Sequence, residues 1–449
     1  MTQAEAKPAK RHRGEQLEVE IDSLAFGGRG VARADGMVVF VAGALPGDRV
    51  RAEVTKAKRR FAEARTVELL RPGADRVADR CCHGGEPCPG APWQGLPYER
   101  QLSHKQEQVD EALRRIGGLD GFDLEPIEPA TEQWRYRNKL EYSFGADEEG
   151  EPILGFHARG RWDLIIDVED CLLASERGNE ARNELREWAR MEAVPPYDGR
   201  SQEGTLRNLV VREGRRTGQV QTRLVTSAAR FPKPPVDLHT VVEGPSGGTD
   251  GPTGVLGEER LREELRGLRL EMSHGAFFQT NTEMAERLYG VAAEYAGLSG
   301  SERVFDLYCG IGTIGLTMAA RAGEIWGLEI VPEAIADAER NAEANGIANA
   351  RFVAGNARTG VRPLIERAGR PDVVVIDPPR AGLSQKIVRR VIECDSPRIV
   401  YVSCNPTTLA PNAAQLTEAG YTLRRVRPVD MFPQTPHIEC VALLEKEGS

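Results

Sequence analysis

A cysteine motif near the carboxyl end of the chain has the residue types needed for covalent chemistry on a ligand. The apolar run Ile399-Val-Tyr-Val402 predicts a buried strand, and Ser403-Cys-Asn-Pro406 ends it because proline cannot continue strand pairing. Cys404 is therefore expected at a sheet edge, where α/β enzymes bind ligands and a thiol can act as a nucleophile. Since a lone cysteine is more often a small buried hydrophobe, the other motifs must decide between these interpretations.

A second group of residues is typical of nucleoside binding. The glycine loop Asp306-Leu-Tyr-Cys-Gly-Ile-Gly-Thr313 lies between a predicted strand and a predicted helix, where glycines allow a ligand to approach the backbone. The next strand ends at Glu329, about 20 residues on, where such folds place the carboxylate that binds a ribose diol. With no phosphate-binding lysine motif, the pattern favours S-adenosylmethionine as the cofactor.

Three further polar residues are expected at the same edge of the sheet. Asp377 follows the fourth strand in the rigid loop Asp377-Pro-Pro-Arg380. Asn356 follows the third strand, where it either meets the adenine ring or simply forms a turn. Gln279 precedes the first helix of the domain, for which Thr280 or Asn281 is a plausible N-cap.

The segment 81–93 combines cysteines with glycine and proline, a composition that suits a metal site. Cys81, Cys82 and Cys88 lie here, and Cys171 can supply a distant fourth thiolate, the number that a [4Fe–4S] cluster takes. The alternative is a flexible loop with inert thiols.

The elements that position these residues divide the chain into four parts. We expect a disordered tail at 1–14, a closed β-barrel at 15–72, a central β-rich domain at 73–270, and a doubly wound α/β domain at 271–449. The two last strands of the α/β domain are too close in sequence for a helical crossover, so the final strand should run antiparallel. The predicted helix at 98–117 is expected on the α/β domain, and residues 229–258 as loop, with a surface insertion at 244–252.

Composition limits the classes of protein to which the chain can belong. A length of 449 residues predicts several domains, and no apolar run is long enough to cross a membrane, so we expect a cytoplasmic protein without an obligate protein partner. The net charge is -9, yet residues 1–72 are at +4, with five basic residues between Arg51 and Arg60. A local basic patch on an acidic protein can bind RNA phosphates, although a solvated surface gives the same pattern.

Taken together, these motifs resemble the RNA (uracil-5-)methyltransferases, and the barrel resembles an RNA-binding TRAM domain. The resemblance covers almost the whole chain and rests on these segments: 26–32, 43–50, the cysteine cluster, Tyr136-Arg-Asn-Lys139, Phe278-Gln-Thr-Asn281, 306–313, 377–380, 403–406 and Phe432-Pro-Gln-Thr-Pro-His-Ile-Glu439. It implies Cys404 as nucleophile and Glu439 as general base. The cofactor residues that it implies are Gln279, Tyr308, Thr313, Glu329, Asn356 and Asp377.

The chemistry of uracil supports the first two roles independently. Addition of a thiolate at C6 makes C5 nucleophilic, and a base must later remove the C5 proton so that the thiolate can leave. The topology brings Cys404 and Glu439 to one edge, whereas the competing thiols Cys309, Cys394 and Cys440 lie in the glycine loop, in a helix and opposite to Glu439. Alternatives are an RNA cytosine-5 methyltransferase and a non-catalytic RNA-binding iron–sulfur protein.

The cysteine cluster departs from the family pattern Cys-x5-Cys-x2-Cys. Cys82 and Cys88 match it, but Ala91 stands at the third position, where Cys81, or less readily His83, is the available substitute. The resemblance also implies that the RNA is ribosomal, in particular 23S RNA, with transfer RNA as the alternative.

Overall fold

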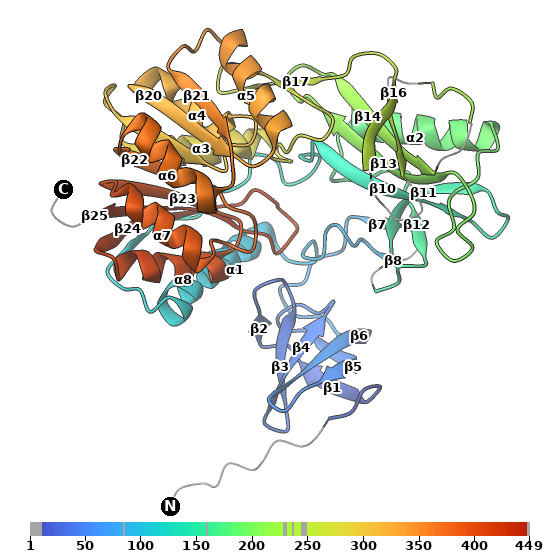
Figure 1. The fold of residues 1–449 in the computed structure, drawn as a ribbon. Coiled ribbons are helices and arrows are strands. Elements are labelled where there is room, and N and C mark those ends of the chain that lie inside the picture. The colour runs from blue at the N-terminus through green and yellow to red at the C-terminus, as the bar shows by residue number, and fades with distance from the viewer. Residues whose placement is uncertain are drawn as a thin grey trace, which may run out of the picture.

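The computed structural model describes residues 11–83, 86–158, 160–227, 231–235, 238–243 and 249–446. Figure 1 shows a small β-barrel below two larger α/β bodies, the central domain and the carboxyl-terminal catalytic domain. None of the described helices is long and apolar enough to span a bilayer.

The amino-terminal barrel is a six-stranded sheet in the order β1-β5-β6-β4-β3-β2. Its strands are β1 (Gln16–Glu20), β2 (Ser23–Leu24), β3 (Gly30–Ala34), β4 (Met37–Ala42), β5 (Arg49–Ala57) and β6 (Phe61–Arg71). Alternating side chains point inward, so residues such as Val39, Val50 and Val54 form a core of their own. Residues 1–10 of the expected tail lie outside the described residues. Residues 11–14 instead contact the barrel, because the Gly14 N–H donates to the Val54 carbonyl.

The central domain is a seven-stranded sheet in the order β12-β11-β10-β13-β14-β15-β16, covered by the helix α2. Its elements are β10 (Lys139–Ala146), β11 (Pro152–His157), β12 (Ile165–Asp167), α2 (Glu176–Met191), β13 (Leu206–Glu213), β14 (Val220–Ser227), β15 (Leu238–Glu243) and β16 (Thr249–Val255).

Three expectations for the central region need correction. The helix α2 was not predicted, although Ser175 caps it and Ala181, Leu185 and Trp188 bury a helical stripe against the sheet. Residues 238–243 and 249–255, expected as loop, form strands, because β15 pairs with both β14 and β16. Residues 244–248 of the expected insertion lie outside the described residues.

The third correction concerns the boundary at residue 271. A hairpin of β17 (Leu261–Leu265) and β18 (Leu268–Met272) pairs upstream of this boundary. Leu265 and Leu270 bury their side chains in the core of the catalytic domain. The catalytic domain therefore includes this hairpin. Its alternating apolar and polar residues resemble those of the preceding strands, so the sequence pattern does not show to which domain it belongs.

The catalytic domain has an eight-stranded sheet in the order β21-β20-β19-β22-β23-β25-β24-β9. Its elements are α3 (Thr282–Ala296), β19 (Arg303–Leu307), α4 (Thr313–Met318), η2 (Ala319–Arg321), β20 (Glu324–Glu329), α5 (Pro332–Ala344), β21 (Ala350–Ala354), α6 (Ala357–Ala368), β22 (Val373–Ile376), α7 (Gln385–Cys394), β23 (Arg398–Ser403), α8 (Pro406–Thr417), β24 (Tyr421–Val429) and β25 (Glu439–Lys446). Helices cover both faces of the sheet (Figure 1). The central strands are therefore apolar throughout: Ile399 and Tyr401 belong to one core, Val400 and Val402 to the other.

The final strand runs antiparallel, as expected. β25 lies between β23 and β24 and is antiparallel to both. The short β9 (Asp123–Leu124) joins the far edge of this sheet. It follows α1 (Tyr98–Glu111) and η1 (Ala112–Ile116), which pack against α8, as expected for this helix. In the sequence, two short paired strands, β7 (Cys82–His83) and β8 (Glu86–Pro87), follow the barrel and precede α1.

Candidate active site

The site lies where the carboxyl ends of β19, β22 and β23 meet the amino end of β25. The pairs Leu307 with Ile376, Ile376 with Tyr401 and Ser403 with Cys440 fix this edge. The residues that follow these strands therefore lie side by side, although they are far apart in the sequence.

Cys404 is the first residue after β23 and is half-buried. Asn405 behind it caps α8 by accepting the Thr407 N–H at 3.0 Å, and its amide donates to the Arg380 carbonyl at 3.2 Å. This cap fixes the turn that carries the thiol. Burial, followed by the charges of Glu439 and Asp377, raises the Cys404 pKa to about 12, while Arg380 partly offsets them. The resting side chain is therefore a neutral thiol.

Glu439 is the first residue of β25 and is 3% exposed. Because Ser403 pairs with Cys440, the carboxyl group starts its strand beside the end of β23. Burial and the neighbouring charge of Asp377 raise the Glu439 pKa well above its usual value. A carboxyl group of this kind accepts a proton readily once it is ionised.

The side chains of the three competing thiols are buried in hydrophobic cores and are not exposed at this edge. Cys440 and Cys394 belong to the core on one face of the sheet. Cys309 packs beneath the glycine loop against Leu316 and Phe352. Among the eight cysteines, all of them described, Cys404 alone combines partial exposure with this edge of the sheet.

The glycine loop has a constrained backbone and an unsatisfied buried oxygen. Tyr308 adopts a φ of 68°, unusual for a residue with a side chain, and Gly312, at φ 85°, is the N-cap residue before α4. One carboxylate oxygen of the buried Asp306 accepts the Gly315 N–H at 2.8 Å, while the other has no partner. The space beside Gly310 is open, since a Cβ there would meet nothing within 4 Å. These features fit a polar ligand bound at the loop.

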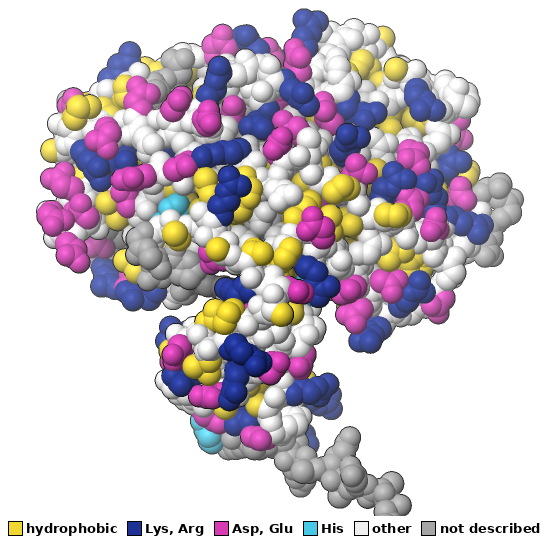
Figure 2. All heavy atoms as spheres, turned by 180° about the vertical axis from the view of Figure 1, so that it is seen from behind, with side chains coloured by type: hydrophobic (Ala, Val, Ile, Leu, Met, Phe, Trp, Pro, Cys, Tyr) yellow, Lys and Arg dark blue, Asp and Glu magenta, His cyan; other side chains and the backbone are white. Residues whose placement is uncertain are grey.

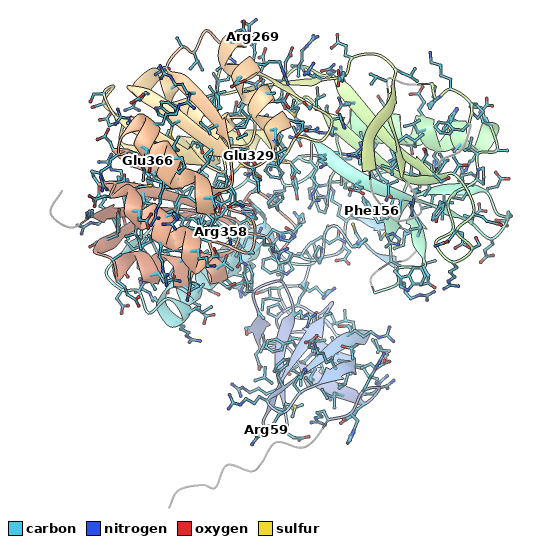
Figure 3. All side chains as sticks on the ribbon, viewed as in Figure 1. Arg59, Phe156, Arg269, Glu329, Arg358 and Glu366 are labelled. Carbon is cyan, nitrogen blue, oxygen red and sulfur yellow. The ribbon has the colours of Figure 1, made fainter. Side chains whose placement is uncertain are left out.

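The other expected cofactor residues surround this loop. The Glu329 carboxylate accepts the N–H groups of Gly310 at 3.2 Å and Val331 at 3.0 Å, which holds it opposite the glycines. Figure 3 shows Glu329 on the side of the catalytic domain that faces the central domain. Thr313 starts α4 and contacts the Tyr289 hydroxyl. Asn356 caps α6 by accepting the Arg358 N–H at 2.9 Å.

Two carboxyl groups at the edge carry unusual pKa values. Burial and the charge of Asp306 raise the Asp377 pKa to about 7. Burial raises the Asp306 pKa to about 7, against the hydrogen bond from Gly315, and Glu329 adds to the rise. Acidic groups thus converge at this edge, and a ligand with positive charge would relieve their repulsion.

The central domain positions part of the site through the segment 136–139, a role that its sequence did not reveal. The Asn138 amide donates to the Gln279 carbonyl at 2.9 Å, and the Asn138 N–H donates to the Thr280 carbonyl at 2.8 Å. The buried Tyr136 hydroxyl donates to the Pro433 carbonyl at 3.0 Å. Gln279 is consequently buried at the junction of the two domains.

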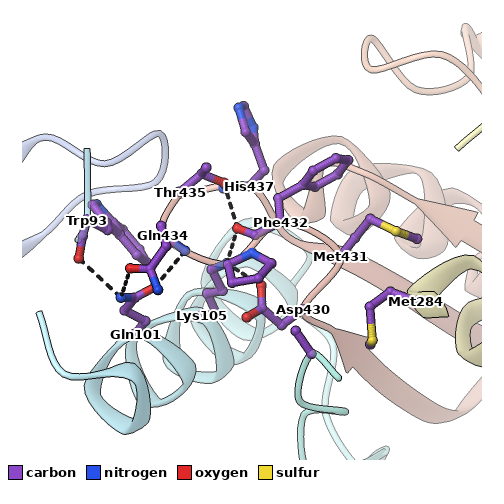
Figure 4. A network of polar contacts seen from close by, with 12 residues as sticks. Trp93, Gln101, Lys105, Met284, Asp430, Met431, Phe432, Gln434, Thr435 and His437 are labelled. Atoms are coloured by element: carbon purple, nitrogen blue, oxygen red, sulfur yellow. Dashed lines mark hydrogen bonds and ion pairs between the residues drawn. The ribbon is translucent and has the colours of Figure 1, made fainter. Parts of the chain in front are cut away.

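A buried polar network holds the loop that precedes Glu439 (Figure 4). The Lys105 ammonium on α1 pairs with the Asp430 carboxylate at 2.5 Å and donates to the Phe432 carbonyl at 3.0 Å, with both charged groups fully buried. Gln101, one turn earlier, accepts the Gln434 N–H at 2.9 Å. The buried face of α1 is therefore mostly polar, with Val109 as its one apolar residue. The available signal was the i, i+4 spacing of Gln101 and Lys105.

The expected metal ligands lie apart from this edge, and only some of them come together. Cys81, His83 and Cys88 place their ligand atoms within 4.8 Å of one another. Cys171 is buried nearby, within electrostatic range of Cys81 and Cys88. Cys82, which fits the family spacing, is exposed.

The chain is similar in sequence to two family models and to several RNA methyltransferases. Residues 255–447 match the family model of tRNA (uracil-5-)-methyltransferase, and residues 10–67 match that of the TRAM domain. An uncharacterized RNA methyltransferase of Halalkalibacterium halodurans is 37% identical, and the match covers 97% of this chain and 98% of that protein. One from Porphyromonas gingivalis is 39% identical over 95% and 99% of the two chains.

A solved structure agrees with these matches. The Pyrococcus abyssi tRNA (uracil-54, C5)-methyltransferase, in complex with S-adenosyl-L-homocysteine, is 29% identical, with a TM-score of 0.77 over 95% of this chain and 100% of that chain.

The doubly wound sheet with its antiparallel strand β25 and the glycine loop after β19 have the architecture of a class I methyltransferase domain. The barrel in front of it is a TRAM domain. The chain belongs to the RNA (uracil-5-)methyltransferase family and is an S-adenosylmethionine-dependent enzyme.

Proposed function

We propose that Cys404 and Glu439 methylate C5 of a uridine in RNA through a covalent bond between the cysteine sulfur and C6 of the base. The observation that carries this proposal is the strand register. Ser403 pairs with Cys440, which brings the half-buried thiol and the buried carboxyl group to one edge beside the glycine loop. The chain thus supplies both groups that the chemistry of uracil requires.

In this scheme the Cys404 thiol first transfers its proton to solvent water, and the positive charge of Arg380 favours the resulting thiolate. The thiolate then adds to C6, and the electron pair of the C5–C6 bond moves to C5 and the O4 carbonyl. S-adenosylmethionine, when bound, supplies an electrophilic methyl group at C5. Ionised Glu439 removes the C5 proton, the C5–C6 double bond re-forms, and the Cys404 thiolate leaves. The target base must leave its stack to reach this edge.

The residues around the loop fit the cofactor. Glu329, held opposite the glycines, is suited to hydrogen-bond the ribose hydroxyls. We assign Gln279, Tyr308, Thr313, Asn356 and Asp377 to the same cofactor site, with Asn356 near the adenine. The unpartnered oxygen of Asp306 is available to accept a hydrogen bond from the cofactor.

Ribosomal RNA, in particular 23S RNA, is our first candidate substrate, on the family resemblance of the sequence. Transfer RNA is the second, because the family model and the Pyrococcus abyssi enzyme carry that name. The TRAM domain supports an RNA partner of either kind.

The [4Fe–4S] cluster implied by the resemblance fits this chain poorly. A cluster takes four thiolates, but Ala91 replaces one family cysteine and Cys82 is exposed, which leaves Cys81, Cys88 and Cys171 buried. Methyl transfer needs no redox step, so the proposed mechanism does not involve these residues.

The test is transfer of label from methyl-labelled S-adenosylmethionine to unmodified ribosomal and transfer RNA. Wild type should label one of them, with 5-methyluridine in the nuclease digest, and Cys404→Ala should reduce the rate at least about 1,000-fold. Cys394→Ala is the matched control, because this buried thiol at the end of α7 lies outside the site. Labelled 5-methylcytidine would instead identify a cytosine methyltransferase, and no label on either RNA would favour the non-catalytic alternative.

A further inference from the structure

The cysteine segment has geometry that the methyl-transfer site does not explain. The ligand atoms of Cys81, His83 and Cys88 all lie within 4.8 Å of one another, and the His83 Nε2 is 3.4 Å from the Cys81 sulfur. Sulfur ligands of one tetrahedral zinc ion, at about 2.3 Å from the metal, are roughly 3.8 Å apart. In an iron–sulfur cluster each thiolate binds a different iron atom, so the ligands spread around a larger core. The observed spacing suits a single ion.

A fourth ligand is available from the central domain. The segment 171–173 lies directly against the loop that carries Cys88: Leu172 packs on Cys81 and Cys88, and a Cβ on Gly90 would meet Leu173 at 3.1 Å. Cys171 itself is 1% exposed and within electrostatic range of both thiols, although its sulfur lies outside the group of three whose ligand atoms are all within 4.8 Å of one another, so it would have to move closer to complete a four-ligand site. Its backbone is held in place, because the Cys171 N–H donates to the Asn179 side chain at 2.9 Å.

A buried cation beside Cys171 provides independent support. Arg182 on α2 is fully buried, and two of its guanidinium nitrogens, Nε and Nη1, have no hydrogen-bond partner. Its third nitrogen, Nη2, donates to the Glu169 carbonyl and to the Asn179 side chain. Among the described residues no carboxylate is close enough for an ion pair with Arg182; Asp167 and Asp170 act on it from farther away, and Tyr142 and Cys171 are also its neighbours. A buried charge without a counter-ion is costly. Three thiolates around one divalent ion leave a net negative charge, which would compensate the arginine.

Hydrogen bonds from a neighbouring side chain also fix the backbone of Cys81. The Gln94 side chain accepts the Cys81 N–H and donates to the Cys81 carbonyl, each at 2.7 Å. Support of this kind, from residues that do not touch the metal, is typical of metal sites in proteins.

We propose that Cys81, His83, Cys88 and Cys171 bind one zinc ion as a tetrahedral Cys₃His site in place of an iron–sulfur cluster. The ion joins the segment after the barrel to the start of α2. Since the Trp93 N–H donates to the Gln434 carbonyl at 3.0 Å, this segment also abuts the loop before Glu439. The zinc site is thus structural, and it is independent of the mechanism proposed for Cys404.

The test measures metal in the untagged full-length chain, purified without oxygen from cells grown with iron and zinc. Wild type should hold about one zinc per chain and no acid-labile sulfide, and its cobalt-substituted form should show the strong visible bands of a tetrahedral thiolate site. Cys88→Ser should lose the ion, and His83→Ala should bind it at least about tenfold more weakly in a chelator competition. The matched control is Cys82→Ala, which should keep the ion, because Cys82 is exposed.

Three results would overturn the proposal: about four irons with sulfide per chain, loss of metal in Cys82→Ala equal to that in His83→Ala, or wild type without metal. If Cys88→Ser does not fold, the cobalt spectrum and the chelator competition on wild type and His83→Ala still show whether the site binds a single zinc ion through His83.

Discussion

At the scale of single residues, the proposed nucleophile Cys404 and the proposed base Glu439 are both protonated in the resting protein, which is the inactive form of each group. Burial keeps the Cys404 thiol and the Glu439 carboxyl group neutral, although the reaction needs both in their ionised forms. A positively charged ligand among these acidic groups, together with Arg380, favours ionisation. The resting protein thus stores the nucleophile and the base in unreactive forms.

The pH dependence of the reaction follows from these two groups. Because both pKa values are raised, the reactive thiolate and carboxylate become more abundant as the pH rises. The single-turnover rate on saturating RNA should therefore increase from about pH 6 to pH 9, by roughly tenfold per unit where one ionisation limits it. A stopped assay over this range, with circular dichroism as a control for folding, measures it. A rate that is constant or decreases over the same range would contradict this account.

The sequence was informative about these residues to different degrees. Cys404, Asp377 and Glu329 could be placed because each directly follows or ends an apolar strand, and strand ends of a parallel sheet share an edge. Asp306 and Asn138 could not be assigned from the sequence. The unpaired oxygen of Asp306 and the contact from Asn138 to Gln279 depend on three-dimensional packing across domains.

At the scale of elements, α1 binds the loop that precedes the proposed general base Glu439 and holds it in place. Its buried face is polar, with Gln101 and Lys105 bound to Gln434 and Asp430. Periodicity predicted the helix and its place on the catalytic domain but not this face, because a hydrophobic pattern cannot show a buried ion pair. Likewise α2 was missed because its apolar stripe is narrow among charged residues.

Loss of the Lys105 charge should destabilise the protein. Lys105→Met leaves the Asp430 carboxylate buried without a cation, which typically costs about 3–5 kcal/mol. We expect a lower melting temperature and slower methyl transfer, because the loop before Glu439 loosens. Thermal unfolding and the label-transfer assay measure the two effects. The control is Arg115→Met, which removes an exposed pair with Glu111 and should change neither. Equal stability of the two variants would show that the buried pair does not fix the loop.

At the scale of the whole molecule, the barrel supplies a separate surface for RNA. Acidic and basic side chains are interspersed on it (Figure 2), and several arginines, such as Arg51, pair with glutamates. The expected basic patch is therefore smaller than its sequence suggested. It is limited to the tip between β5 and β6, where Lys58, Arg59 and Arg60 are exposed. Figure 3 shows Arg59 at the end of the barrel far from the catalytic domain.

This tip should contribute to RNA affinity through phosphates. Replacing Lys58, Arg59 and Arg60 together by alanine should weaken RNA binding and reduce the slope of log affinity against log salt by about 2 to 3. The rate at saturating RNA should not change. Filter binding at several salt concentrations measures the slope, with Arg49→Ala as the control because Arg49 pairs with Glu18. An unchanged slope would place the RNA contacts elsewhere.

The central claim is that Cys404 bonds to C6 of the target uridine and Glu439 resolves the adduct. The most direct measurement is peptide mapping by mass spectrometry of Glu439→Gln after incubation with substrate RNA and S-adenosylmethionine. We predict a stable adduct, with one methylated uridine on the peptide that contains Cys404, and no adduct in the double variant with Cys404→Ala. An adduct on Cys309 or Cys440, or methylation that persists in Cys404→Ala, would contradict the account.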